Sequence, residues 1–120
     1  MAKLTDSSDY AYAQAHFSPD RLWEFFDGDP SSLNIAHECV DRHAAADDRR
    51  IAIRIAHADG RDEALTFRTV AEASSRFAHW LVARGVERGD RVAVMLEPSL
   101  PSYAALFGAM KRGAVAVPLF

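Results

Sequence analysis

The sequence predicts an α/β fold made of N-terminal helices, a β-hairpin and a parallel strand–helix–strand unit. Isoleucines alternate with other residues at 51–55, which is the period of two expected of a strand. Further along, apolar runs at 91–97 and 114–120 flank a helical pattern at 100–112. Two strands joined by a helix are normally parallel, with a right-handed crossover, so these observations together indicate the α/β class.

The first third of the chain contains two short helical patterns. Residues 1–17 are polar with scattered aromatic side chains, and we expect an irregular arm there. The stretch SPDRLWEFF predicts a short helix, with Ser18 as cap, Pro19 at the first position and Asp20 near the positive end of the dipole. The stretch NIAHECVDRHAAAD predicts a second helix, which Asn34 caps. Its expected apolar stripe consists of Ala36, Val40 and Ala44.

A hairpin and a long amphipathic helix follow. Asp59-Gly60 predicts the hairpin turn, because glycine adopts a positive φ without a side-chain clash. Leu65 and Phe67 are expected to continue the apolar face on the return strand. The stretch RTVAEASSRFAHWLVARG predicts a helix that ends at Gly85 in the left-handed conformation. Its expected buried stripe consists of Val70, Ala73, Phe77 and Leu81.

The last third carries the strand–helix–strand unit. The unbroken apolar run in 91–97 is typical of a strand that is covered on both faces. Ser99 is expected to cap the next helix and Gly113 to end it. Phe120 would then lie near the carboxyl end of a parallel strand, where open α/β sheets keep their binding crevices. The side chains expected to point one way from the helix are Tyr103, Phe107 and Met110.

Composition narrows the classes of function. The net charge is −3, whereas proteins that bind nucleic acid or anionic membranes are usually basic, so we expect neither partner. The first residues lack the apolar segment of a secretory signal, and no apolar run approaches the ~20 residues of a membrane helix. The single cysteine, Cys39, excludes an internal disulfide and fits a reducing compartment, so the predicted location is the cytoplasm.

The sequence patterns assign no catalytic, cofactor-binding or metal-binding residue. The six glycines form no phosphate-binding loop, and no serine lies in a GxSxG motif. In HECVDRH, His37 and His43 do not have the i, i+4 spacing of a metalloprotease helix. Cys39 and His43 have that spacing, but two ligands do not make a metal site. The favoured interpretation is a core cysteine beside a boundary histidine.

The weaker candidates are also interpreted structurally. Asp47–Arg50 is expected to be a solvated turn rather than an acid/base pair. Glu97 is expected to keep a strand end hydrated, with ligand contact at the crevice edge as the lesser alternative. The aromatic residues expected to staple a helix onto a core, rather than to stack on bases, are Trp23, Phe25 and Phe26.

Several short motifs occur in one order along the second half of the chain. They are Leu65-Thr66-Phe67, Gly85-Val86, Gly89-Asp90-Arg91-Val92-Ala93, Lys111-Arg112-Gly113 and Val117-Pro118-Leu119. This order resembles the opening of the large domain of adenylate-forming acyl-CoA ligases. Upstream, NIAHECVDRHA is similar to the N-terminal helix of the acetyl-CoA and medium-chain or aryl acyl-CoA synthetase branch. The resemblance covers roughly residues 18–120.

The resemblance implies a parent enzyme that uses ATP and Mg²⁺ to convert a carboxylic acid into an acyl-adenylate, with release of pyrophosphate. Coenzyme A then takes the acyl group as a thioester. The acid is expected to be small aliphatic, medium-chain or aromatic. The phosphate loop, the adenine-binding and ribose-binding motifs and the C-terminal lysine of such enzymes lie further along, so no catalytic residue is carried over to residues 1–120.

These residues are therefore expected to be an incomplete N-terminal portion of the large domain, inactive alone and binding none of these cofactors. Its parts would be an arm with a short helix over 1–33 and the start of the α/β core over 34–120. The expected partner is the remainder of the same chain, and an unpaired strand at 114–120 predicts self-association of the isolated piece. The main alternative is a stand-alone α/β module that binds a nucleotide or an acyl group; an interaction adaptor is the third reading.

Overall fold

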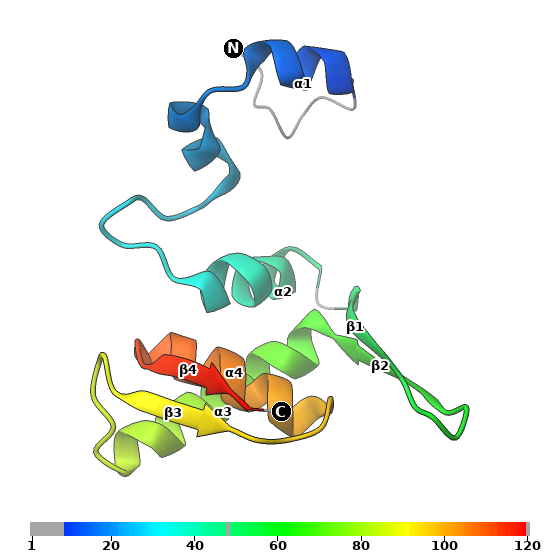
Figure 1. Ribbon diagram of the computed structural model, residues 1–120, viewed down its shortest axis with the longest axis vertical. Coiled ribbons are helices and arrows are strands. Elements are labelled where there is room, and N and C mark those ends of the chain that lie inside the picture. The colour runs from blue at the N-terminus through cyan, green and yellow to red at the C-terminus, as the bar shows by residue number, and fades with distance from the viewer. Residues whose placement is uncertain (1–8, 48, 120) are drawn as a thin grey trace. The chain divides into compact units, whose positions relative to one another are not determined.

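The computed structural model describes residues 9–47 and 49–119. The chain divides into two compact units, with the boundary between Leu33 and Asn34. Both are drawn in Figure 1. Three parts of the sequence predictions lie outside the described residues: residues 1–8 of the expected arm, Asp48 of the expected turn and Phe120 of the last expected strand.

The first unit contains the helix α1 (Tyr10–His16), where the sequence predicted an irregular arm. That prediction is wrong for this segment because Asp9 caps the helix. The Asp9 carboxylate accepts a hydrogen bond from the backbone N–H of Ala11 at 2.9 Å. The ring of Tyr12 also stacks on that of His16 one turn later, with centroids 4.0 Å apart.

A 3₁₀-helix, η2 (Pro19–Phe25), follows at the predicted place. Pro19 starts it as expected, but the Ser18 side chain makes no capping hydrogen bond, so that part of the prediction is wrong. The N–H of Arg21, which a capping hydroxyl would use, is already bonded to the carbonyl of Ser18 at 3.0 Å. Trp23 contacts Phe26, with ring centroids 5.8 Å apart. None of residues 9–33 is buried, so the stapling of these aromatics onto a core stays a prediction.

The second unit begins with the predicted helix, which runs through η3 (His37–Asp41) into α2 (Arg42–Ala46). Asn34 caps it as predicted, because its side-chain oxygen accepts from the N–H of Ala36 at 3.0 Å. The Asn34 amide also donates to the carbonyl of Met110 at 3.2 Å. A single side chain therefore starts one helix and ties it to another.

The segment η3 has π-helical hydrogen bonding, and this changes which side chains are buried. The N–H of Arg42 bonds to the carbonyl of His37, five residues back. Ala36 and Val40 are buried as expected, but Glu38 is buried too. The predicted core cysteine, Cys39, is exposed. The wide turn changes the angle between successive residues, so α-helical spacing does not correctly place positions beside the stripe, such as Cys39.

The predicted hairpin is confirmed as β1 (Ile51–Ala56) and β2 (Asp62–Thr66), which pair antiparallel. Gly60 closes the turn that begins at His57, and it has the positive φ, +85°, that the sequence predicted. Asp59 accepts a hydrogen bond from the Arg61 side chain at 2.6 Å, which lowers the pKa of that carboxyl. A bulge between Ile51 and Ile53 interrupts the register, and Ile51 is exposed.

Phe67 opens the helix α3 (Phe67–Ala83) instead of continuing the return strand. The Thr66 hydroxyl accepts from the N–H of Thr69 at 3.1 Å, and this cap ends the strand one residue earlier than predicted. The predicted stripe is confirmed, with Phe77 half-buried and the others buried. The buried members are Val70, Ala73 and Leu81.

Helix α4 (Leu100–Arg112) packs against α3. Ser99 and Gly113 bound it as predicted: the Ser99 hydroxyl accepts from the N–H of Ser102, and Gly113 has a φ of +80°. Its buried face is made of small residues, namely Ser102, Ala104, Ala105, Gly108 and Ala109. The larger Tyr103 and Phe107 are half-buried and pack against the cluster of Val40, Ile55, Leu65 and Val70.

The strands β3 (Arg91–Val94) and β4 (Val115–Pro118) pair in parallel, as predicted (Figure 1). Both are shorter than the apolar runs suggested. The last bond of the ladder runs from the N–H of Leu119 to the carbonyl of Val94 at 2.9 Å. The paired register ends at Val94 and Pro118, and residues 95–98 have no partner strand in the described part of the chain.

One face of this sheet packs on α3 and α4. Val92 and Ala116 contact the cluster of Leu81, Ala109 and Ala114. On the other face Ala93 is exposed and Val115 is 51% exposed. Within the described residues only one face of the sheet is covered, so the predicted cover on the second face stays a prediction.

Candidate functional site

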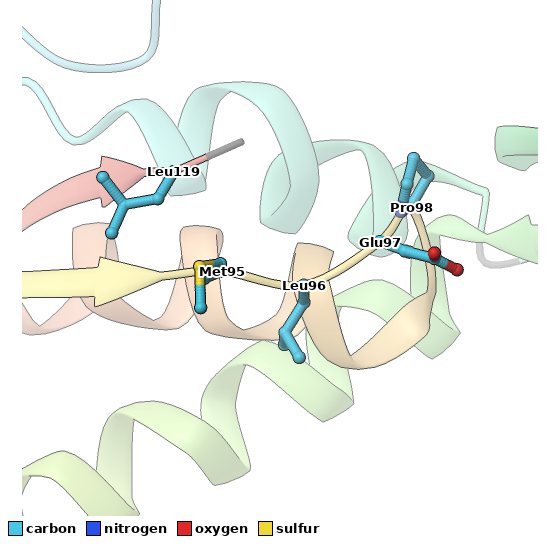
Figure 2. Close-up of a pocket in the computed structure, with 5 residues that line it drawn as sticks. All are labelled: Met95, Leu96, Glu97, Pro98 and Leu119. Carbon is cyan, nitrogen blue, oxygen red and sulfur yellow. The ribbon is translucent and has the colours of Figure 1, made fainter.

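A shallow cavity lies where β3 and β4 end. Its volume is about 310 Å³. Figure 2 shows its lining residues at the carboxyl ends of the two strands: Met95, Leu96, Glu97, Pro98 and Leu119. Because the strands are parallel, their carboxyl ends meet at one edge of the sheet, where α/β folds place their ligands. This strand-end cavity is the candidate site that the sequence indicated.

The strand-end cavity is apolar and open. Met95 is 73% exposed and Leu119 is 45% exposed, so both walls face solvent. Among the described residues of the lining, Glu97 is the one that is ionisable, and Figure 2 shows its carboxylate directed away from Met95 and Leu119. The described part of this lining offers apolar contact, and none of its side chains directs a nucleophile or a general base into the cavity.

Glu97 lies beyond the strand rather than at its end. The strand stops at Val94, and Glu97 is exposed. The carbonyl of Glu97 accepts a hydrogen bond from the Ser99 hydroxyl at 2.9 Å, so its backbone supports the start of α4. The exposure of Glu97 agrees with the expected role of keeping this end of the strand hydrated. Contact between Glu97 and a ligand stays a prediction.

A second groove, of about 290 Å³, lies between α3 and α4. Its lining consists of Ser75, Ala78, His79, Val82, Lys111 and Arg112. The Lys111 ammonium contacts the Asp41 carboxylate at 2.6 Å, the Ser75 hydroxyl at 2.9 Å and the Ala71 carbonyl at 3.1 Å. An ammonium has three donors, so each of them already has an acceptor within the fold.

Lys111 and Arg112 therefore have structural roles that the motif Lys111-Arg112-Gly113 did not reveal. Lys111 joins three helical segments, and Arg112 donates from Nε to the carbonyl of Val86 at 2.7 Å. These contacts link the end of α4 to the loop that enters β3. The sequence alone does not reveal these contacts, because Asp41 lies 70 positions from Lys111.

The helix HECVDRH does not form a metal centre in the structure. His37 and Cys39 are exposed. His43 is half-buried, with its ring 5.0 Å from that of Phe67 and its Nδ1 3.2 Å from Arg50 Nη2. Among residues 9–47 and 49–119, no group of three or more His, Cys, Asp or Glu side chains is placed to hold a metal ion.

The expected solvated turn is confirmed for its described members. Asp47, Arg49 and Arg50 are exposed, and the Asp47 carboxylate accepts from the N–H of Arg49 at 3.2 Å. The Arg50 guanidinium also lies over the Phe67 ring, 4.8 Å from its centroid.

Across the described segments, no helix combines the length and apolar character that a membrane crossing requires.

Comparison with solved structures identifies the class of fold. A solved acyl-CoA synthetase of Brucella canis superposes with a TM-score of 0.79 and 29% identity, over 95% of this chain and 21% of that chain. A fatty acid AMP ligase of Legionella pneumophila shares the fold, with a TM-score of 0.66 at 24% identity over 74% of this chain and 15% of that chain. The chain thus has the architecture that opens the large N-terminal domain of adenylate-forming enzymes.

The sequence comparisons then identify the family. The model of the AMP-binding enzyme family matches residues 40–120, and this chain belongs to that family. The acetyl-coenzyme A synthetase of Bacillus subtilis is 41% identical over 90 residues, or 73% of this chain. The enzyme of the same name from Halorhodospira halophila is 40% identical over 93 residues, or 76% of this chain. The matched segment spans 16% and 14% of those two proteins, respectively.

Proposed function

We propose that this chain is the N-terminal structural part of an ATP-dependent acyl-CoA ligase of the cytoplasm. The whole enzyme would activate a carboxylic acid as an acyl-adenylate, release pyrophosphate and transfer the acyl group to coenzyme A. The observation that carries the proposal is the family match over residues 40–120, together with 41% identity to an acetyl-coenzyme A synthetase. Because the relatives carry that name, acetate is the first acid to test.

The described residues do not fit a site for a triphosphate or for Mg²⁺. The strand-end cavity is lined by Met95, Leu96, Pro98 and Leu119, and the Glu97 carboxylate turns away from it. Phosphate sites need converging N–H groups or cations, and Mg²⁺ needs several oxygens. In the second groove, the donors of Lys111 are bound to other residues. We therefore expect ATP, Mg²⁺ and coenzyme A to bind to the remainder of the whole enzyme rather than to the described residues.

The role that we assign to this chain is to set the start of the sheet. The pairing of β3 with β4 brings two carboxyl ends together, and Lys111 fixes the helix that connects the strands. The exposed side of the sheet, with Val115 and Ala93, and its outer edges would receive the remainder of the same chain. In the isolated 120 residues, we expect these surfaces to drive self-association instead.

The test is acid-dependent pyrophosphate release by the full-length protein. We expect release with ATP, Mg²⁺ and one acid from a panel of acetate, hexanoate and benzoate, and thioester formation only when coenzyme A is added. Pyrophosphate release with no thioester would contradict the ligase and indicate an adenylation enzyme of another kind. No release with any acid in a wide panel would overturn the proposal.

The isolated chain of 120 residues is the matched control. We expect neither ATP turnover nor saturable ATP binding from it, measured by pyrophosphate release and by calorimetry. Saturable binding of a nucleotide or of an acyl group by the isolated chain would favour the alternative, a stand-alone binding module.

A further inference from the structure

We draw no further inference here: the strongest candidate, the basic groove between α3 and α4 lined by Ser75, His79, Lys111 and Arg112, carries nothing because the Lys111 donors are bound to Asp41, Ser75 and Ala71 and no other described group there points to a ligand.

Discussion

At the scale of single residues, Lys111 carries more of the fold than its place in a short motif suggests. Its ammonium binds the Asp41 carboxylate of η3 and, in α3, the Ser75 hydroxyl and the Ala71 carbonyl. The side chain is only 12% exposed, so water does not readily replace these partners. Removing the ammonium would leave the Asp41 carboxylate, which is itself partly protected, without a cation.

Lys111→Met is expected to lower the free energy of unfolding by about 1–3 kcal/mol, because charge-assisted hydrogen bonds are lost while the aliphatic volume is kept. Urea denaturation of the variant and the parent measures the difference. The double variant Lys111→Met/Asp41→Asn should recover part of the loss, since the unpaired charge is gone. Strictly additive single effects would show that the two residues do not interact.

Gly108 lies where α3 and α4 approach each other closely, and the stability of that interface depends on its lack of a side chain. A Cβ at this position would lie 2.7 Å from the Ser74 carbonyl oxygen and 2.9 Å from Phe77 Cδ1. Gly108→Ala should therefore destabilise the fold by about 1–3 kcal/mol through overpacking, although alanine favours a helix by about 1 kcal/mol. Thermal unfolding checks the sign, with the exposed Arg76→Ala on α3 as control. A stabilised Gly108→Ala variant would contradict the close approach.

At the scale of elements, the sequence predicted well wherever one period ran through a whole segment. The alternating isoleucines gave β1, and the stripe of Val70, Ala73 and Leu81 gave α3, because burial on one face imposes those spacings. The prediction failed where hydrogen bonding left the regular pattern, as in η3, where Cys39 is exposed and Glu38 is buried.

It also missed the buried face of α4, because that face is built from small residues. Hydrophobic stripes are found by looking for large side chains such as Tyr103 and Phe107, and these are only half-buried. Ala104, Gly108 and Ala109 are buried because small side chains let the helices approach closely. No hydropathy pattern signals this, since closeness depends on the size of the facing residue.

Gly113 ends α4 two residues before β4 begins, so its conformation sets the direction in which the chain enters the strand. With a φ of +80°, an alanine there is expected to lose about 1–2 kcal/mol of stability from backbone strain, and its Cβ would also lie 3.2 Å from Arg88 Cγ. Gly60→Ala is the matched control, with a φ of +85° and no atom within 4 Å of the added Cβ.

We therefore expect Gly113→Ala to lose more stability than Gly60→Ala in parallel urea titrations. Adding Arg88→Ala to Gly113→Ala should bring the two losses closer, because the steric part is removed. Equal losses for the two single variants would show that the Arg88 side chain moves aside at no cost in stability.

At the scale of the whole molecule, the candidate site could be located from the sequence but not described by it. The parallel pairing predicted that the two strand ends meet, and the strand-end cavity is there. The sequence could not show that Met95 and Leu96 lie beyond the strand, because apolar character runs on past the last paired residue, Val94. Nor could it identify Leu119 as the facing wall, since that depends on the register between β3 and β4.

The exposed sheet face predicts the behaviour of the isolated chain. We expect residues 1–120 to sediment above the monomer mass, increasingly so with concentration, because an exposed apolar sheet face packs against other copies of the chain. Val115→Lys should shift the distribution toward monomer, since a charge then lies on that face. Val82→Lys on α3 is the control, because Val82 is 54% exposed and Val115 is 51% exposed. An equal effect of the two variants would place the association elsewhere.

The hydrogen bond between Asn34 and Met110 spans 76 positions, and the contact between Asp41 and Lys111 spans 70. A nascent chain emerges from the ribosome from its N-terminus, so the helix that starts at Asn34 appears long before either partner does. Until residue 111 leaves the exit tunnel, that helix lacks both stabilising contacts. Ribosome-stalled chains cut short before and after this point should therefore differ sharply in their resistance to protease.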